Sequence, residues 1–211
     1  MILAPEFLRD AAIGVAVVRK PEELTHLLKS DCGAALWQRK VLPDFQRWID
    51  GLAPENLPRG RLILRPEAVR DAIAQLCDLA DMPDHPHRTR LIDDIAALSD
   101  ISAKLMDARW LRLRLDAVTT NACRKFHIDA IAARLVCTYR GAGTQYGNAP
   151  RGRSPDRVVT VPTGSPILLR GTLWPARTET PLLHRSPPIE DTGETRLVLV
   201  LDPVDDPEGA L

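Results

Sequence analysis

The most constraining feature of this sequence is a change in hydrophobic periodicity near residue 110. Before that point apolar residues recur every three or four positions, and after it they alternate with polar residues. The first pattern is typical of amphipathic helices and the second of half-buried strands. We therefore expect the helices and most of the strands to occupy different parts of the chain, as in α+β proteins.

Three helices are predicted in the first half of the chain. The first covers residues 44–52. The second begins at Pro66, because proline in the first turn followed by an acid favours a helix start. The third covers residues 88–108, where apolar side chains recur at helical spacing. Two short strand-like runs, at 13–18 and 34–37, precede these helices.

The second half of the chain predicts short strands joined by fixed loops. Leucines alternate with charged residues from Leu111 to Asp116. Eight of the 18 prolines lie between residues 150 and 190, which excludes helices there. Further apolar runs occur at 133–139, 157–161, 166–170 and 196–201.

These patterns predict an α+β fold in a single domain over residues 1–211. A mainly helical portion with short strands, residues 1–109, would pack on a C-terminal double-stranded β-helix over residues 110–202. Residues 203–211 would form a tail. Several short strands with regular turn signals favour such a jelly-roll or cupin-like architecture.

The composition disfavours several classes of partner and site. The 211 residues include 28 Lys and Arg against 28 Asp and Glu, without the basic excess typical of nucleic-acid or membrane-surface binders. No apolar run approaches the ~20 residues of a membrane span, and the N-terminus shows no secretory signal, so we expect a cytoplasmic protein. The four cysteines form no CxxC pair, which indicates reduced thiols rather than a four-thiolate zinc site.

The strongest candidate site combines His127, Asp129 and His184. Residues two apart on a strand point to the same side, so His127 and Asp129 are predicted to hold one metal ion from one strand, with His184 arriving from another. Two imidazoles and one carboxylate leave coordination positions open, as in the facial triad of non-haem Fe(II) oxygenases. Because such a triplet is common by chance, the hypothesis depends on its position between strand-like segments.

Three more residues are candidates for the same pocket. Arg196 could form a two-pronged ion pair with a substrate carboxylate, and a charged strand-start residue at the rim is the alternative. Tyr139 would share the side of Asp129 on an unbroken strand, but a bend at residues 130–133 would leave it a core aromatic. Arg134 is either a cation of the pocket or a structural ion-pair partner.

The order His-x-Asp, distant His and Arg at the start of the next strand resembles the Fe(II)/2-oxoglutarate-dependent dioxygenases with a double-stranded β-helix. More closely, three stretches are similar to the bacterial family known as domain of unknown function 1826. The similarity covers roughly residues 10 to 202. The stretches are CRKFHID at 123–129, RLVCTYRGAGT at 134–144 and HRSPP at 184–188.

The dioxygenase resemblance implies a role for each matching residue. His127, Asp129 and His184 would hold Fe(II), which 2-oxoglutarate would chelate. Arg196 would bind the far carboxylate of 2-oxoglutarate, with help from the Tyr139 hydroxyl. The implied activity is hydroxylase-type oxidation of an unknown substrate, coupled to decarboxylation of 2-oxoglutarate to succinate.

Two other hypotheses stay open. The same three residues would hold Zn²⁺ in a zinc-binding protein or zinc hydrolase, and the resemblance to the 1826 family implies a link to zinc homeostasis. The other hypothesis is a jelly-roll binding module without a metal. A buried Arg196 beside the triad favours the oxygenase, because an unpaired buried charge is costly unless an anion meets it. An Arg196 that faces solvent favours zinc.

Two further clusters offer zinc ligands. The loop at residues 81–87 contains two acids together with His85 and His87. Its alternative interpretation is a proline-containing turn with polar side chains in water. Cys123 and His127 are four residues apart, a spacing that suits a helix or turn and conflicts with a strand at His127.

Overall fold

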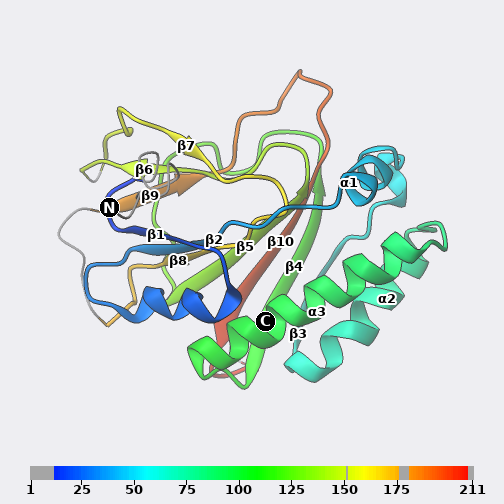
Figure 1. The fold of residues 1–211 in the computed structure, drawn as a ribbon, viewed down its shortest axis with the longest axis horizontal. Helices are drawn as coiled ribbons and strands as arrows, with labels where there is room; N and C mark the ends of the chain where they lie inside the picture. Colours follow the sequence, from blue (N-terminus) through cyan, green and yellow to red (C-terminus); the bar gives the residue numbers. More distant parts are fainter. Residues whose placement is uncertain (1–11, 151, 176–180, 209–211) are drawn as a thin grey trace, which may run out of the picture.

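The computed structural model describes residues 12–150, 152–175 and 181–208. Its central element is a seven-stranded sheet with the strand order β1-β2-β8-β5-β10-β4-β3 (Figure 1). β1 and β2 pair in parallel, and all other neighbours in this sheet pair antiparallel. The strands are β1 Val15–Val18, β2 Ala34–Trp37, β3 Gly60–Leu64, β4 Trp110–Val118, β5 Ala133–Arg140, β8 Ile167–Arg170 and β10 Arg196–Val204.

A smaller sheet covers part of one face of the large sheet. It contains β6 (Gln145–Asn148), β7 (Val159–Thr160) and β9 (Leu182–Arg185) in the order β7-β6-β9. Figure 1 shows it near the end of the large sheet that carries β1, β2 and β8. Apolar side chains from both sheets form one buried cluster between them, which includes Val15, Leu36, Tyr146, Val161, Ile167 and Leu182.

Helices cover the opposite face of the large sheet. α3 (Pro86–Met106) packs on β10 and β4, α2 (Val69–Leu79) packs on α3, and α1 (Pro43–Asp50) lies against β5. Three 3-10 helices complete this layer, η2 (Pro21–Leu28), η3 (Pro54–Asn56) and η4 (Pro66–Ala68).

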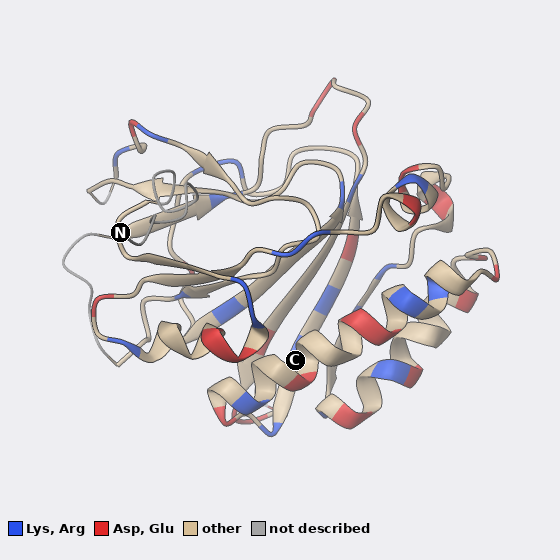
Figure 2. Ribbon diagram, viewed as in Figure 1, with Lys and Arg blue, Asp and Glu red and all other residues tan. Residues whose placement is uncertain are grey.

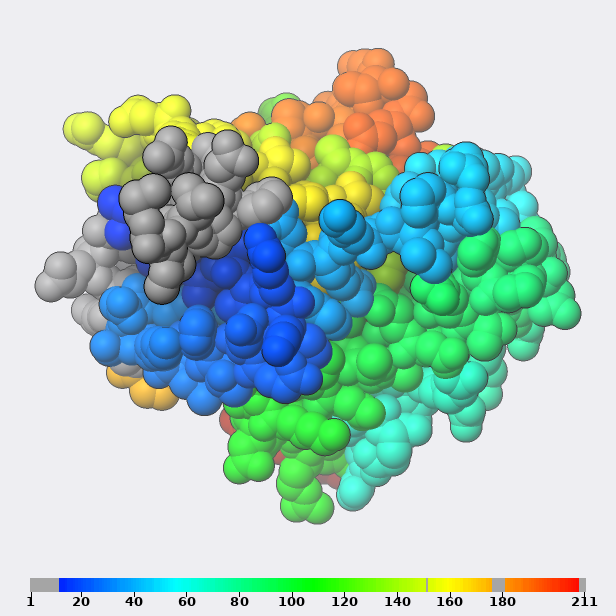
Figure 3. Space-filling view, viewed as in Figure 1, coloured from blue at the N-terminus to red at the C-terminus, as the bar shows by residue number. Residues whose placement is uncertain are grey.

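The helical layer has an apolar inner side and a charged outer side. The main buried core beneath it includes Ile73, Leu91, Ile95, Leu113 and Leu199. Figure 3 shows the helical segments covering the lower part of the visible surface. Acidic and basic residues are interspersed along α2 and α3 (Figure 2), as expected for the solvent side of amphipathic helices. No helix in the described ranges has the length and apolar character needed to cross a membrane.

Alternation along β5 and β10 separates the two faces of the large sheet. Their odd-numbered residues from 133 to 139 and from 197 to 201 lie in the core beneath the helices. Even-numbered residues such as Arg134, Val136, Val198 and Val200 line a cavity on the other face. Because successive side chains of a strand point to opposite faces, parity decides which residues reach this cavity.

The predicted α+β class is confirmed, and each predicted helix is present within a few residues of its expected bounds. The portion before residue 109 contributes three strands to the large sheet, of which Gly60–Leu64 was not predicted. β10 continues to Val204, so the predicted tail begins two residues too early; residues 209–211 lie outside the described part. The large sheet is open, with β1 and β3 at its edges, so a closed barrel is absent from the described residues.

The central strand β10 should contribute strongly to stability. Leu199 is fully buried in it and lies between its partners on β4 and β5. We expect Leu199→Ala to lower the free energy of unfolding by about 2–5 kcal/mol, through lost burial and the remaining cavity. Urea unfolding measures this change. Leu79→Ala, at an 81% exposed position, is the control. An equal effect of both substitutions would contradict the assignment of this core.

Candidate metal centre

His127 and His184 face each other because their backbones pair. His184 lies on β9, and His127 forms an isolated antiparallel bridge with it. Each backbone N–H donates to the other residue's carbonyl at 3.0 Å. Residues directly opposite in such a pair carry their side chains on the same side. The centroids of the two imidazole rings are consequently 4.5 Å apart.

Asp129 completes this group. Its carboxylate oxygens lie 3.0 Å from Nε2 of His184 and 3.5 Å from Nε2 of His127. One donor atom from each of the three residues lies within 4.8 Å of the others, and no other set of His, Cys, Asp or Glu in the described ranges has this geometry. The structure therefore brings together the three residues that the sequence singled out. Their role as metal ligands stays a prediction.

The prediction that His127 and Asp129 share a strand is wrong. β5 begins only at Ala133, and residues 130–132 form a bend. The loop is held beside the end of β8, where the N–H of Thr172 donates to the Asp129 carbonyl at 2.9 Å. Gly171 permits this approach, since a Cβ there would lie 2.0 Å from the carbonyl oxygen of Ile131. The carboxylate of Asp129 thus reaches the site from a loop.

A backbone contact sets the tautomer of His127. Its Nδ1 lies 2.8 Å from the carbonyl oxygen of Lys125. A carbonyl can only accept, so Nδ1 carries the proton and Nε2 of the neutral imidazole keeps its lone pair. Contacts of this kind orient histidine ligands in metal sites. Nε2, the nitrogen that faces Asp129, is therefore the available metal ligand.

The protonation states of the group fit a bound cation. Oδ2 of Asp129 is buried and accepts no hydrogen bond from the described residues, and a buried acceptor without a partner is costly. Burial raises the pKa of the Asp129 carboxyl. His127, His184 and Arg134 lower it by more than burial raises it, so the pKa stays well below its usual range. Burial lowers the pKa of His184, whereas the Asp129 carboxylate raises the pKa of His127. A carboxylate and a neutral imidazole are the forms that bind metals, and this donor set suits a divalent transition metal.

Arg134 holds the second oxygen of Asp129. Its Nη1 is 2.8 Å from Oδ1 of Asp129, while Nε and Nη2 donate to the two oxygens of Asp202 at 2.7 Å each. Asp202 lies on β10 and is buried, so it fixes the guanidinium to the large sheet. Arg134 therefore leaves Oδ2 of Asp129 directed toward His184. Both alternatives predicted for Arg134 apply, because it lines the cavity and forms ion pairs.

An Arg134→Gln variant is expected to bind Co(II) about 10- to 100-fold more weakly, because residues that orient metal ligands contribute about this much to affinity. The ligand-field absorption of bound Co(II) should also change, which a purely structural role would not produce. Arg134→Lys keeps the charge without the planar fork and should restore affinity only in part. Arg140→Gln, at the end of the same strand, is the control. Unchanged affinity and spectrum in a folded Arg134→Gln protein would contradict the positioning role.

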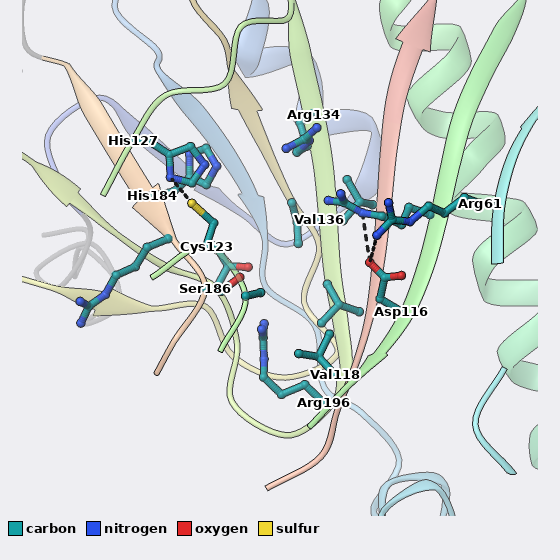
Figure 4. A pocket seen from close by; sticks show the side chains of 16 residues that line it. Arg61, Asp116, Val118, Cys123, His127, Arg134, Val136, His184, Ser186 and Arg196 are labelled. Carbon is teal, nitrogen blue, oxygen red and sulfur yellow. Dashed lines mark hydrogen bonds and ion pairs between the residues drawn. The ribbon is translucent and has the colours of Figure 1, made fainter. Parts of the chain in front are cut away.

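His127 and His184 line a cavity of about 220 Å³ on the sheet face opposite the helices, and Asp129 contacts both of them. Figure 4 shows His127 and His184 together on one side of it. Arg61 and Asp116 lie on the other side, and Arg196 lies at one end. Residues from β4, β5, β9 and β10 contribute to its lining.

Arg196 lies inside this cavity and is only 1% exposed. Its Nε donates to the carbonyl of Ala142 at 2.6 Å, and its Nη2 donates to Oγ1 of Thr138 at 3.3 Å. No carboxylate of the described residues forms an ion pair with it within 4.0 Å. Burial lowers its pKa to about 10. The guanidinium is thus a buried cation with unused capacity for an anion.

Thr138 contacts Arg196 and is a residue that the sequence prediction missed. It lies on the same face of β5 as Arg134 and Val136, and its hydroxyl accepts a hydrogen bond from Arg196. The signal was available in the possible bend at residues 130–133, which shifts the parity of β5 relative to Asp129. If β5 begins after that bend and Arg134 points to the cavity side of the sheet, then Thr138, four residues later on the same strand, points to the same side.

The prediction that Tyr139 assists Arg196 is wrong. Tyr139 lies on the opposite face of β5, in the core beneath the helices. Its hydroxyl donates to Oδ2 of Asp94 on α3 at 2.7 Å. Arg39 forms two hydrogen bonds with the same carboxylate at 2.6 Å each. Tyr139 is therefore the core aromatic that the alternative interpretation predicted.

The other candidate zinc clusters have structural contacts instead. In the loop at 81–87, Nδ1 of His85 accepts a hydrogen bond from the His87 N–H at 3.1 Å, and the His85 ring stacks on Trp48 at 5.4 Å. Sγ of Cys123 lies 3.6 Å from Nδ1 of His127, the nitrogen opposite the one that faces Asp129. Neither cluster forms a three-ligand group among the described residues.

Comparison with solved structures identifies the class of fold. The chain is similar to dioxygenase for auxin oxidation 1 from Arabidopsis thaliana in its binary complex with 2-oxoglutarate, with a TM-score of 0.52, 11% identity and coverage of 95% of this chain and 98% of that chain. It is also similar to the rice dioxygenase for auxin oxidation, with a TM-score of 0.48, 14% identity and coverage of 93% and 84%. The first likeness shows that the chain shares the fold of a 2-oxoglutarate-binding dioxygenase.

The sequence identifies the family. The chain belongs to the family described as protein of unknown function DUF1826, whose model matches residues 18–202. This confirms the family resemblance found in the sequence. No curated protein matches the chain in sequence.

Proposed function

We propose that the protein is a non-haem oxygenase that uses Fe(II) and 2-oxoglutarate to oxidise a small substrate. The observation that carries this proposal is the group of His127, Asp129 and His184, whose two histidines line the cavity that also contains the buried Arg196. The fold shared with a 2-oxoglutarate-bound dioxygenase supports it. We also interpret the two facing sheets as an open form of the double-stranded β-helix.

Each residue of the cavity would have a distinct task. Nε2 of His127, Nε2 of His184 and Oδ2 of Asp129 would hold Fe(II), which supplies the redox chemistry of dioxygen activation when bound. Arg196 would bind the far carboxylate of 2-oxoglutarate, because a guanidinium pairs with a carboxylate through two parallel hydrogen bonds. Thr138 would orient Arg196 through their hydrogen bond.

Zinc would fit the same three donors, so the metal alone does not separate an oxygenase from a zinc protein. Arg196 is the observation that favours the oxygenase. A zinc hydrolase needs only the metal and its water, and it gives no reason for a guanidinium that is buried in the same cavity without a carboxylate partner. A dicarboxylate co-substrate supplies that partner.

Anaerobic reconstitution tests the proposal. Adding 2-oxoglutarate to the Fe(II)-loaded protein should produce a visible metal-to-ligand charge-transfer band. The band should be lost in His184→Ala and retained in His85→Ala, which alters an exposed histidine outside the cavity. Tightly held zinc by elemental analysis, with no such band after metal exchange, would contradict the oxygenase and favour a zinc protein.

A further inference from the structure

The cavity contains more arginines than are required to bind 2-oxoglutarate. Among the described residues that line it, Asp116 is the only carboxylate, whereas five are arginines. Two of them are accounted for, since Arg134 is paired with Asp129 and Asp202 and Arg196 is assigned to 2-oxoglutarate. The lining arginines are Arg61, Arg114, Arg134, Arg185 and Arg196.

Arg185 has contacts of its own near the edge of the cavity. Its Nε donates to Oε1 of Gln145 at 2.8 Å, and its guanidinium lies 4.5 Å from the ring centroid of Phe126. These contacts hold the side chain beside the smaller sheet. They fix the position of Arg185 without neutralising its charge, so the arginines whose placement is still unexplained are Arg61 and Arg114.

Arg61 lies on the wall opposite the histidines (Figure 4), and Arg114 forms a cationic pair with it. They lie directly opposite each other on β3 and β4. Both contact the same oxygen of Asp116, at 3.2 Å from Nε of Arg114 and 3.9 Å from Nη2 of Arg61. Nε of Arg114 is buried and forms no hydrogen bond within the described part of the chain. Two guanidiniums that share one carboxylate leave a net positive charge.

The floor between this pair and the metal site is apolar. The register places Arg114 opposite Val200, and Val200 opposite Val136 on the next strand. Val198 lies two residues along β10 on the same face, and all three valines line the cavity. A molecule that reaches from the histidines to Arg61 and Arg114 would therefore cross apolar side chains before it meets positive charge.

We propose that the substrate is a small organic anion, with an apolar segment over these valines and a carboxylate or phosphate group bound by Arg61 and Arg114. This inference rests on the proposed function, because it assigns the substrate class of the same cavity. Guanidiniums bind either group through paired hydrogen bonds. The pair is placed to hold the anionic end while the apolar segment lies near the metal site.

Calorimetric titration of the anaerobic protein, loaded with Fe(II) and 2-oxoglutarate, tests the inference. The probes are phenylacetate, phenyl phosphate and the neutral phenylacetamide. At least one anion should bind about tenfold more tightly than the amide, as charge-assisted hydrogen bonds predict. The stronger anion identifies the preferred group. Equal binding of all three probes, or no measurable binding of either anion, would overturn the proposal.

Variants that remove a positive or a negative charge from the cavity distinguish anion binding by Arg61 and Arg114 from a purely structural role. The double variant Arg61→Gln/Arg114→Gln should lose the preference for the anion, whereas Asp116→Asn should strengthen it. Arg59→Gln, an exposed arginine next to β3 outside the cavity, should leave it unchanged. A double variant that retains the preference while folded would overturn the assignment, as would weaker anion binding in Asp116→Asn.

Failure of the proposed function gives a different result. If the wild type binds no 2-oxoglutarate, the oxygenase proposal fails, and the same titration is then made on the Arg196→Met variant so that Arg196 cannot bind the probes. An anion preference that persists there and depends on Arg61 and Arg114 would support an anion site without the oxygenase. Its absence would overturn the anion site as well.

Discussion

An Asp129→Ala variant is expected to lose Fe(II) binding and all turnover of 2-oxoglutarate to succinate. The carboxylate is the only anionic donor of the three, and its buried Oδ2 accepts no hydrogen bond within the described structure. Because residues that merely orient ligands change metal affinity by about 10- to 100-fold, loss of a ligand should lower the affinity by at least about 100-fold. Fe(II) titration and succinate assays measure the two effects.

The Asp129→Ala protein should still fold. Arg134 would keep its two hydrogen bonds to Asp202, so the guanidinium would not be left as an unpaired buried charge. Asp100→Ala, which alters an exposed position of α3, is the control and should retain iron binding and turnover. Succinate formation that survives in Asp129→Ala would count against the assignment of the metal ligands.

An Arg196→Met variant is expected to lose 2-oxoglutarate binding by about 100-fold or more, because charge-assisted hydrogen bonds to a buried guanidinium contribute roughly 1.5–3 kcal/mol each. The unliganded variant should be at least as stable as the wild type. Burying a charge costs several kcal/mol, and the wild-type Arg196 offsets this cost through hydrogen bonds to Ala142 and Thr138 but through no ion pair within the described residues. A large loss of 2-oxoglutarate affinity without a loss of stability would show that Arg196 serves binding rather than folding.

Thermal unfolding with and without 2-oxoglutarate measures both effects of Arg196→Met. The ligand should raise the Tm of the metal-loaded wild type by mass action and leave that of the variant unchanged. Arg170→Met is a matched comparison, because Arg170 is also buried but lies outside the cavity. The Arg170→Met protein should be stabilised by 2-oxoglutarate as much as the wild type is. An Arg196→Met protein that 2-oxoglutarate still stabilises would contradict the assignment of Arg196.

The sequence alone determined most of the element types and the identity of the candidate ligands. Hydrophobic spacing repeated over whole segments is a local signal, which is why α2, α3, β4 and β5 were predicted within a few residues. β3 escaped prediction because Gly60–Leu64 is short and its periodicity is weak. His127, Asp129 and His184 were selected by residue type and order, which need no coordinates.

Only the tertiary structure decided how these residues meet and what surrounds them. The bend at residues 130–132 separates Asp129 from β5, so Thr138 meets Arg196 and Tyr139 faces α3. Arg134 meets Asp202 across 68 positions of sequence, and Arg61 meets Arg114 through the register of β3 and β4. A one-residue shift along a strand moves every later side chain to the other face of the sheet. Pairing between distant strands leaves no periodic signal in either strand. Local sequence patterns therefore could not predict these contacts.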